Sequence, residues 1–190
     1  MSVITPRIAP LTPPYDPETE ASLLKWMPPG SPIEPLLLFR TIMLHGQLAG
    51  RMRGTGAGIL GATATVPAPL REVMIHRTCA LTGAEYEWGV HAVAFGRRLG
   101  LTDEQLHSTA HGASADACWD RHQSIVFELA DQLHVTSAIA DELWERLVDA
   151  FDAEQIIELI VTAGWYHVIA YVCNGLRLEH EPWAATFPTA

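Results

Sequence analysis

The segment from Glu72 to His91 decides how this chain folds, and it reads EVMIHRTCALTGAEYEWGVH. Gly83 lies near its middle and is typical of a helix end, so the segment predicts two helices that meet there. Residues four apart on a helix share a face, which places Glu72 beside His76 and Glu87 beside His91. Two carboxylate–imidazole pairs on adjoining helices indicate a candidate site for handling protons.

Helical patterns continue on both sides of this segment. Thr102 with Gln105 three residues later predicts a capped helix start, and further caps are expected at Thr136, Ser137 and Asp152. The predicted helices span 36–45, 47–58, 70–81, 84–99, 102–110, 116–133, 137–150 and 153–176, and the glycine-rich stretch 54–69 reads as a connection. No segment alternates with period two, so the sequence predicts an all-α helical bundle.

The first 32 residues differ from the rest because they contain eight prolines, which exclude a long helix. A short helix within 16–26 is compatible with this pattern. The segment 1–32 is therefore expected to be an N-terminal arm that lies across the domain or across a neighbouring subunit. A disordered tail fits the same composition. Residues 33–190 are expected to form a single helical domain.

The composition excludes several functions and favours self-association. A length of 190 residues suits one domain with a buried core. Only 18% of the residues are charged, so part of the surface is expected to be covered in a homo-oligomer (a dimer, trimer or hexamer). The net charge of −10 without a lysine or arginine cluster argues against binding nucleic acid or an anionic membrane.

The same features indicate a protein of the reducing cytoplasm. No uninterrupted apolar run reaches the roughly 20 residues that a membrane span requires. The N-terminus lacks the apolar core of a signal peptide. The three cysteines, Cys79, Cys118 and Cys173, are odd in number and form no Cys-x-x-Cys motif, so they predict neither a disulfide framework nor a redox pair.

Two interpretations of the central histidines and carboxylates are open. Glu72, His76 and Cys79 share one face of the first helix, whereas apolar residues such as Met74 occupy the opposite face. This arrangement suits a catalytic helix. However, Glu–His pairs four residues apart also occur on ordinary solvated faces, where each adds only about 0.2–0.5 kcal/mol to helix stability.

The residues from Arg71 to Leu101 resemble the carboxymuconolactone decarboxylase family, which has the helical fold of alkylhydroperoxidase D. The resemblance is carried by Arg71-Glu72, by the run Ala-Glu-Tyr-Glu-Trp at 84–88, by His91, and by Gly-Arg-Arg-Leu-Gly-Leu-Thr at 96–102. It extends outward to Arg-Ile-Ala-Pro-Leu at 7–11, Pro-Tyr-Asp-Pro at 14–17, Tyr-His at 166–167 and Asn-Gly-Leu at 174–176. The resemblance therefore covers most of the chain.

The resemblance departs from the peroxidase branch of that family. There, a Cys-x-x-Cys pair precedes a histidine by four residues, and a glutamate on the preceding helix completes the proton relay. Here His91 matches that histidine and Glu72 matches that glutamate, but Ala84 and Glu87 stand where the two cysteines would be. Peroxide reduction through a disulfide needs both thiols, so this activity is not expected.

The resemblance thus implies a cofactor-free, acid–base enzyme that decarboxylates or rearranges a small carboxylated lactone or a related acid. In this hypothesis His91 transfers the proton, Glu72 orients His91, and Glu87 adds a second carboxylate. Histidine suits this role because its unperturbed pKa, about 6.5, lets it gain or lose a proton near pH 7. Two alternatives remain open: a peroxidase that uses Cys79 alone, and a non-catalytic oligomeric domain in which the three residues satisfy one another in the core.

Other polar residues are weaker candidates. Tyr86 is a candidate proton donor, although its helical position faces away from Glu87. His167 lies on the last helix and is expected either to satisfy the core or to line the pocket. His107 and His111 have the spacing of metal-binding helices, but no Glu follows His107, so a solvated face is expected and no metal or cofactor is predicted.

Overall fold

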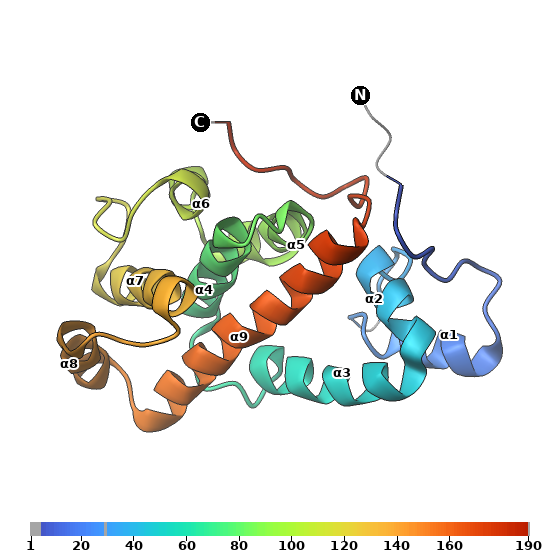
Figure 1. The fold of residues 1–190 in the computed structure, drawn as a ribbon, viewed down its shortest axis with the longest axis horizontal. Helices are drawn as coiled ribbons and strands as arrows, with labels where there is room; N and C mark the ends of the chain where they lie inside the picture. Colours follow the sequence, from blue (N-terminus) through green and yellow to red (C-terminus); the bar gives the residue numbers. More distant parts are fainter. Residues whose placement is uncertain (1–4, 29, 190) are drawn as a thin grey trace.

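The computed structural model describes residues 5–28 and 30–189, and within these ranges it contains helices and connections but no β-strand. Figure 1 shows the helices packed around one another, with the long α9 crossing the molecule. The α-helices are α1 (Pro17–Leu24), α2 (Leu37–Ile42), α3 (Gly46–Leu60), α4 (Ala68–Leu81), α5 (Glu85–His91), α6 (Asp103–His111), α7 (Arg121–Thr136), α8 (Asp141–Ala150) and α9 (Ala153–Leu176). The all-α class predicted from the sequence is confirmed.

Helix α4 lies at the centre because it is apolar on several sides. It contacts α5, α6, α7 and α9 (Figure 1). The sequence predicted one apolar and one polar face for this helix, but the structure buries both faces. Val73 and Met74 are fully buried, and so are Glu72 and His76. A buried carboxylate and imidazole need partners inside the protein, and the neighbouring helices supply them.

Helix α9 joins two parts of the core. One part surrounds α4, α7 and the first half of α9, and the other lies between α2, α5 and the second half of α9. The inward row of α9 consists of Ile156, Leu159, Ala163, Tyr166, Ala170 and Cys173. Helix α9 is long and apolar enough to span a membrane, a test that core helices of soluble proteins also pass. The sequence contains no unbroken apolar run over α9 because uncharged polar residues interrupt it.

The predicted starts of α6 and α9 are confirmed, and a side chain caps each of these helices. Thr102 accepts a hydrogen bond from the backbone N–H of Gln105, whose side chain accepts one in return from the N–H of Thr102. Asp152 and Gln155 form the same capping box at the start of α9. Each cap satisfies N–H groups that have no partner within the helix.

Three predicted boundaries are wrong. Helix α3 continues through the glycines of 54–58 to Leu60, because these glycines adopt helical geometry and Ile59 is buried. Helix α7 starts at Arg121 rather than at 116, because Asp120 forms its capping box. The expected caps Thr136 and Ser137 instead end α7, and α8 starts at Asp141.

The predicted helix over 84–99 is continuous but not uniform. After α5 the backbone widens into a π-helical turn, η2 (Ala92–Gly96), and then narrows into a 3₁₀ turn, η3 (Arg97–Leu99). It ends at Gly100 with φ 93°, as the sequence predicted. A Cβ atom on Gly96 would lie 3.0 Å from Cε1 of His76, so the π turn brings the backbone close against this imidazole.

The described part of the N-terminal arm lies against the helical body. The backbone N–H of Arg7 donates to the carbonyl of Leu176, and its side chain donates to the carbonyl of Gly175. The N–H of Leu11 donates to the carbonyl of Arg40, and Leu23 of α1 is fully buried. These contacts place the described part of the arm against α2 and the end of α9. Residues 1–4 and 29 of the predicted arm lie outside the described residues.

The C-terminal segment 178–189 returns across α5 (Figure 1). The backbone N–H of Ala185 donates to the carbonyl of Gly89, and the N–H of Phe187 donates to the carboxylate of Glu85. A Cβ on Gly89 would lie only 1.8 Å from the carbonyl oxygen of Ala185, so the approach requires glycine here. The segment therefore holds α5 against the core from outside.

Candidate active site

The central helices bring Glu72 and His91 together in the protein interior. Gly83, with φ 64°, turns the chain between α4 and α5. The Nδ1 atom of His91 lies 3.0 Å from Oε2 of Glu72 and 3.3 Å from its Oε1. Helical spacing predicted pairs within each helix, and the family resemblance implied that Glu72 orients His91; the shortest contact between a carboxylate and an imidazole is this second one, which joins the two helices. The exposed fractions of Glu72 and His91 are 1% and 3%.

The predicted pairs within each helix are also present, at longer distances. Nδ1 of His76 lies 3.5 Å from Oε2 of Glu72, and Nε2 of His91 lies 3.4 Å from Oε1 of Glu87. The Nδ1–H group of His76 donates a shorter hydrogen bond, 2.7 Å, to the backbone carbonyl of Glu72. Glu72 thus lies between two imidazoles, and Glu87 lies on the far side of His91.

Helix α9 supplies a fourth polar group that sequence reasoning missed. The hydroxyl oxygen of Tyr166 lies 3.0 Å from Nε2 of His91, and Tyr166 is almost fully buried. Its neighbour His167 was the α9 candidate predicted from the sequence, whereas the inward row of α9 contains Tyr166. Spacings of three and four from Ile156 reach Tyr166 by way of Leu159 and Ala163, which was the available signal. We call Glu72, Glu87, His91 and Tyr166 the polar cluster.

The polar cluster holds His91 as a cation. Burial disfavours the charged imidazole, but the charge and hydrogen bond of Glu72 and the contact with Glu87 outweigh it and raise the pKa of His91 to about 10. Burial favours protonation of Glu72, yet the charge and hydrogen bond of His91 outweigh it and bring the pKa of Glu72 below its usual value. The two residues therefore form a buried ion pair near neutral pH.

His76 and Tyr166 keep their neutral forms beside this pair. Burial lowers the pKa of His76 to about 4, despite the opposing charge of Glu72. Burial also raises the pKa of Tyr166 well above its ordinary value, and Glu87 and Glu72 add to this effect. His91 can thus donate its Nε2–H to the hydroxyl oxygen of Tyr166, whose own proton remains available to another acceptor.

Two buried polar atoms next to the ion pair have no hydrogen-bond partner within residues 5–28 and 30–189. They are Oε2 of Glu87 and Nε2 of His76. An unpaired buried carboxylate oxygen is costly, so Glu87 offers an acceptor for a donor group on a bound molecule. The Phe95 ring lies 5.0 Å from the His91 ring, measured between centroids, and is 38% exposed. Phe95 therefore packs against His91 and reaches the protein surface.

The remaining candidates make their hydrogen bonds outside the polar cluster. The hydroxyl of Tyr86 donates to Glu181 at 2.6 Å. His167 bonds to His134 of α7 and to the carbonyl of Ala163, so it does not line the site with Tyr166. Both His107 and His111 lie on the exposed side of α6, and the described residues contain no group of three or more metal-ligating side chains.

Cys79 is poorly suited to peroxide chemistry. Its side chain is fully buried, and burial raises the pKa of its thiol well above the ordinary value, with Glu87 and Cys173 adding to the shift. The thiolate is the reactive form, so such a cysteine is inert. Cys79 lies near the polar cluster as a packing residue.

Comparison with known proteins supports the fold but assigns no activity to this chain. No family model and no curated protein matches the chain. Among solved structures, the debrominase Bmp8 in complex with 2,3,4-tribromopyrrole (a cysteine-to-alanine variant) superposes with a TM-score of 0.76 and 15% identity, covering 96% of this chain and 94% of that one. Bmp8 without ligand gives 0.76 and 14%, covering 93% and 92%.

A protein of unknown function from Agrobacterium tumefaciens, whose suggested role is antioxidant defence of the AhpD kind, is also similar. It gives a TM-score of 0.63 and 14% identity, covering 72% of this chain and 92% of that one. Identities this low establish the fold alone. The chain therefore has the alkylhydroperoxidase D-like helical fold that its resemblance to the carboxymuconolactone decarboxylase family predicted.

Proposed function

We propose that this protein is a cofactor-free acid–base enzyme of the carboxymuconolactone decarboxylase type, acting on a small carboxylated lactone or a related acid. The observation that supports this proposal is the buried Glu72–His91 ion pair with Tyr166 and Glu87 at the second imidazole nitrogen. An imidazolium held at one nitrogen by a carboxylate can transfer the proton on its other nitrogen, here toward the Tyr166 hydroxyl.

In the proposed reaction the bond between the ring carbon and the carboxylate breaks, and carbon dioxide leaves. The electron pair stays on the ring carbon and spreads into the lactone carbonyl as an enolate. His91, cationic near neutral pH, stabilises this negative charge and supplies the proton that replaces the carboxyl group. Glu72 keeps the imidazole in place, and water afterwards returns the proton to His91.

Tyr166 and Glu87 have separate parts in this proposal. The Tyr166 hydroxyl accepts from His91, so it can pass a proton between the imidazole and the substrate. The unpaired oxygen of Glu87 accepts a hydrogen bond from a donor group on the substrate. Access requires movement of Phe95, the partly exposed side chain packed against His91.

The proposal is tested by screening small carboxylated lactones and keto acids for carbon dioxide release. Hydrogen peroxide with a thiol reductant serves as a comparison, and so does a brominated pyrrole, because Bmp8 binds one. On the substrate that reacts, His91→Ala and Glu72→Gln are expected to reduce turnover by about 10²–10⁴-fold, the usual contribution of a positioned acid or base. Full turnover in both variants would rule the proposal out.

Matched controls separate chemistry from folding. His107→Ala and Glu104→Gln change the same residue types on the exposed side of α6 and are expected to leave turnover unchanged. Circular dichroism must show that each variant remains helical. If every substrate stays intact while the protein is folded, the non-catalytic interpretation of the polar cluster prevails. Peroxide reduction that is lost in Cys79→Ser would instead support the thiol peroxidase.

A further inference from the structure

Arg71, the residue before Glu72 on α4, has a guanidinium group that is poorly satisfied by the chain itself. Its Nη1 atom donates one long hydrogen bond, 3.4 Å, to the backbone carbonyl of Val66. Its Nε atom is buried and has no hydrogen-bond partner within residues 5–28 and 30–189. Arg71 also forms no ion pair in these ranges. Because a buried N–H group without an acceptor is costly, an anion from outside the chain would be favoured here.

Other arginines of the chain use the same edge of the guanidinium to hold a carboxylate. Arg97 donates from Nε and Nη2 to Asp103, at 3.1 and 2.9 Å. Arg77 donates from Nε to Asp131 at 2.6 Å. The edge formed by Nε and Nη2 matches a carboxylate in shape, since each nitrogen can donate to one of the two oxygens. Arg71 offers this edge without a carboxylate from the described residues.

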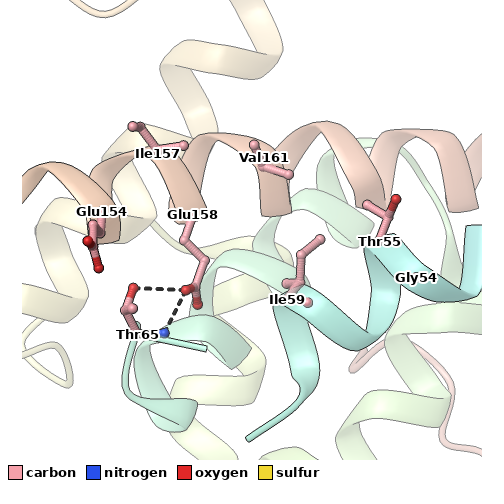
Figure 2. Close-up of a pocket in the computed structure, with 9 residues that line it drawn as sticks. Gly54, Thr55, Ile59, Thr65, Glu154, Ile157, Glu158 and Val161 are labelled. Atoms are coloured by element: carbon pink, nitrogen blue, oxygen red, sulfur yellow. Dashed lines mark hydrogen bonds between the residues drawn. The ribbon is translucent and has the colours of Figure 1, made fainter. Parts of the chain in front are cut away.

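The packing of α4 on α9 determines where Arg71 lies. The loop before α4 is bound to the first half of α9, because Thr65 and Val66 donate hydrogen bonds to the carboxylate of Glu158. Figure 2 shows the two that come from Thr65. At the other end, the side-chain amide of Asn174 donates to the backbone carbonyl of Thr82. Helices α4 and α9 therefore run side by side in the same direction.

This arrangement places Arg71 at the border of the polar cluster. In the register set by the two ends, Arg71 lies about one turn before Tyr166. Side chains on a helix lean toward its N-terminus, so the Tyr166 ring leans back toward the level of Arg71. The electrostatics agrees with this position. Burial raises the pKa of Tyr166, Glu87 and Glu72 add to the effect, and the positive charge of Arg71 opposes it.

An acidic substrate needs a cation beyond those of the polar cluster. The cluster contains two carboxylates, Glu72 and Glu87, against one imidazolium, His91. The net charge of −10 also repels anions from the protein as a whole. Arg71 supplies a second positive charge at this place. Its side chain is partly exposed, so it can meet an anion that enters from solvent.

We propose that Arg71 binds, through Nε and Nη2, a carboxylate that stays on the substrate. This inference rests on the proposed decarboxylation. An ion pair with the carboxylate that leaves would stabilise the ground state, and it would be lost as carbon dioxide forms, so it would slow the reaction. The substrate therefore carries a carboxylate besides the one that it loses. Arg71 holds the first in place while His91 acts on the ring carbon that loses the second.

Binding is tested by isothermal titration calorimetry of the full chain with glutarate, a dicarboxylate that has no lactone ring to decarboxylate. The wild type is expected to bind it. Arg71→Gln is expected to weaken binding by about 10–100-fold, the usual effect of losing charge-assisted hydrogen bonds. Arg71→Lys should recover part of the affinity, because it keeps the charge but lacks the planar edge. Arg40→Gln on α2, where Nε is likewise buried and unpaired among the described residues, should leave binding unchanged.

The role is tested by kinetics on the diacid that releases carbon dioxide in the lactone screen. Arg71→Gln is expected to raise KM at least about tenfold and to change kcat less than about threefold, because it removes binding that substrate and transition state share. His91→Ala is expected to lower kcat instead. A residue that only supports the fold would not produce this difference, and Arg71→Lys would not restore KM.

The outcomes separate this proposal from the catalytic one. Glutarate that does not bind the wild type, or that binds Arg71→Gln equally well, would overturn the assignment of Arg71. A lower kcat with unchanged KM in Arg71→Gln would overturn it as well. If no lactone loses carbon dioxide while glutarate binding still depends on Arg71, the decarboxylase fails and the carboxylate site stands. Circular dichroism and thermal unfolding verify that each variant is folded.

Discussion

At the scale of single residues, Glu72 organises the buried polar groups. Its carboxylate faces His91 from another helix and His76 from its own, and a buried carboxylate with no cation would be strongly destabilising. His91 carries the compensating charge, and His76 remains neutral. Removing either member of the ion pair therefore affects folding as well as chemistry, which is why the variants must be compared with folded controls.

Stability is expected to fall at alkaline pH because of His91. Its pKa is raised to about 10 in the folded protein, against about 6.5 unfolded, so the folded state holds an extra proton between these values. The stabilisation is complete below about pH 6.5 and is lost as pH rises toward 10, by up to about 1.4 kcal/mol per pH unit. Urea unfolding from pH 6.5 to 10.5 should show this slope in the wild type. His91→Gln should flatten it, and an unchanged slope would contradict the shift.

Tyr166→Phe is expected to reduce turnover on the substrate identified in the screen by about 10–100-fold. The variant removes only the hydroxyl that lies 3.0 Å from Nε2 of His91 and keeps the ring in the core. Losing one partner of a buried polar group costs about 1–3 kcal/mol in unfolding free energy, so the fold should survive. Turnover and thermal unfolding are measured together. Tyr171→Phe, on the exposed side of α9, is the matched control and should change neither.

At the scale of elements, the π turn after α5 is a structural requirement of His76. The turn brings Gly96 against this imidazole, which is buried between α4, Trp88 and the His91 ring. A regular α-helix over residues 92–96 would point their side chains in different directions. It would also move Gly100, where the helix ends, relative to α4. The conformation of the π turn therefore depends on the position of the His76 imidazole, which lies beside Glu72.

Gly96→Ala is expected to destabilise the protein by about 1–3 kcal/mol, because its Cβ would lie 3.0 Å from Cε1 and 3.3 Å from Nε2 of the buried His76 ring. Gly175→Ala near the end of α9 is the control, since nothing lies within 4 Å of a Cβ there. Alanine is a better helix former, so the control should be stabilised by up to about 1 kcal/mol. Chemical denaturation measures both. If the two variants have equal free energies of unfolding, the His76 side chain moves aside without a measurable cost.

At the scale of the whole molecule, α5 is held between two layers. Helices α4 and α9 supply the polar partners of His91 on the inside, and the C-terminal segment packs on the outside through Ala185 and Phe187. The Phe187 ring lies 5.5 Å from the Trp88 ring between centroids. The position of His91 thus depends on residues far apart along the chain.

Gly89→Ala is expected to release the C-terminal segment while leaving the helices in place. The new Cβ would lie 1.8 Å from the carbonyl oxygen of Ala185, and a backbone segment without helix structure is easier to displace than α5. Hydrogen exchange at the N–H groups of Ala185 and Phe187 should accelerate by at least about tenfold, the equivalent of 1.4 kcal/mol. Gly175→Ala again serves as the control. Unchanged protection at both groups would show that α5 shifts instead.

The sequence predicted elements more reliably than contacts. Helices α4, α6 and α9 were predicted within two residues at each end, because capping residues or glycine mark most of those ends locally. Helix α3 was cut short because five glycines suggest a loop, and the packing that keeps it helical lies elsewhere in the chain. Helical spacing alone does not pair Glu72 with His91, because their contact depends on how two helices are oriented; that relation came from the family resemblance. Tyr166 was missed because its role requires knowing the inward side of α9.

The C-terminal segment also sets an order of events during translation. Glu85 and its partner Phe187 are 102 residues apart, so at about 5–20 residues per second α5 leaves the ribosome roughly 5–20 s before the segment that encloses it. The imidazole of His91 likewise precedes the α9 tyrosine by 75 residues. The nascent chain therefore lacks the Phe187 contact on Trp88 throughout that interval.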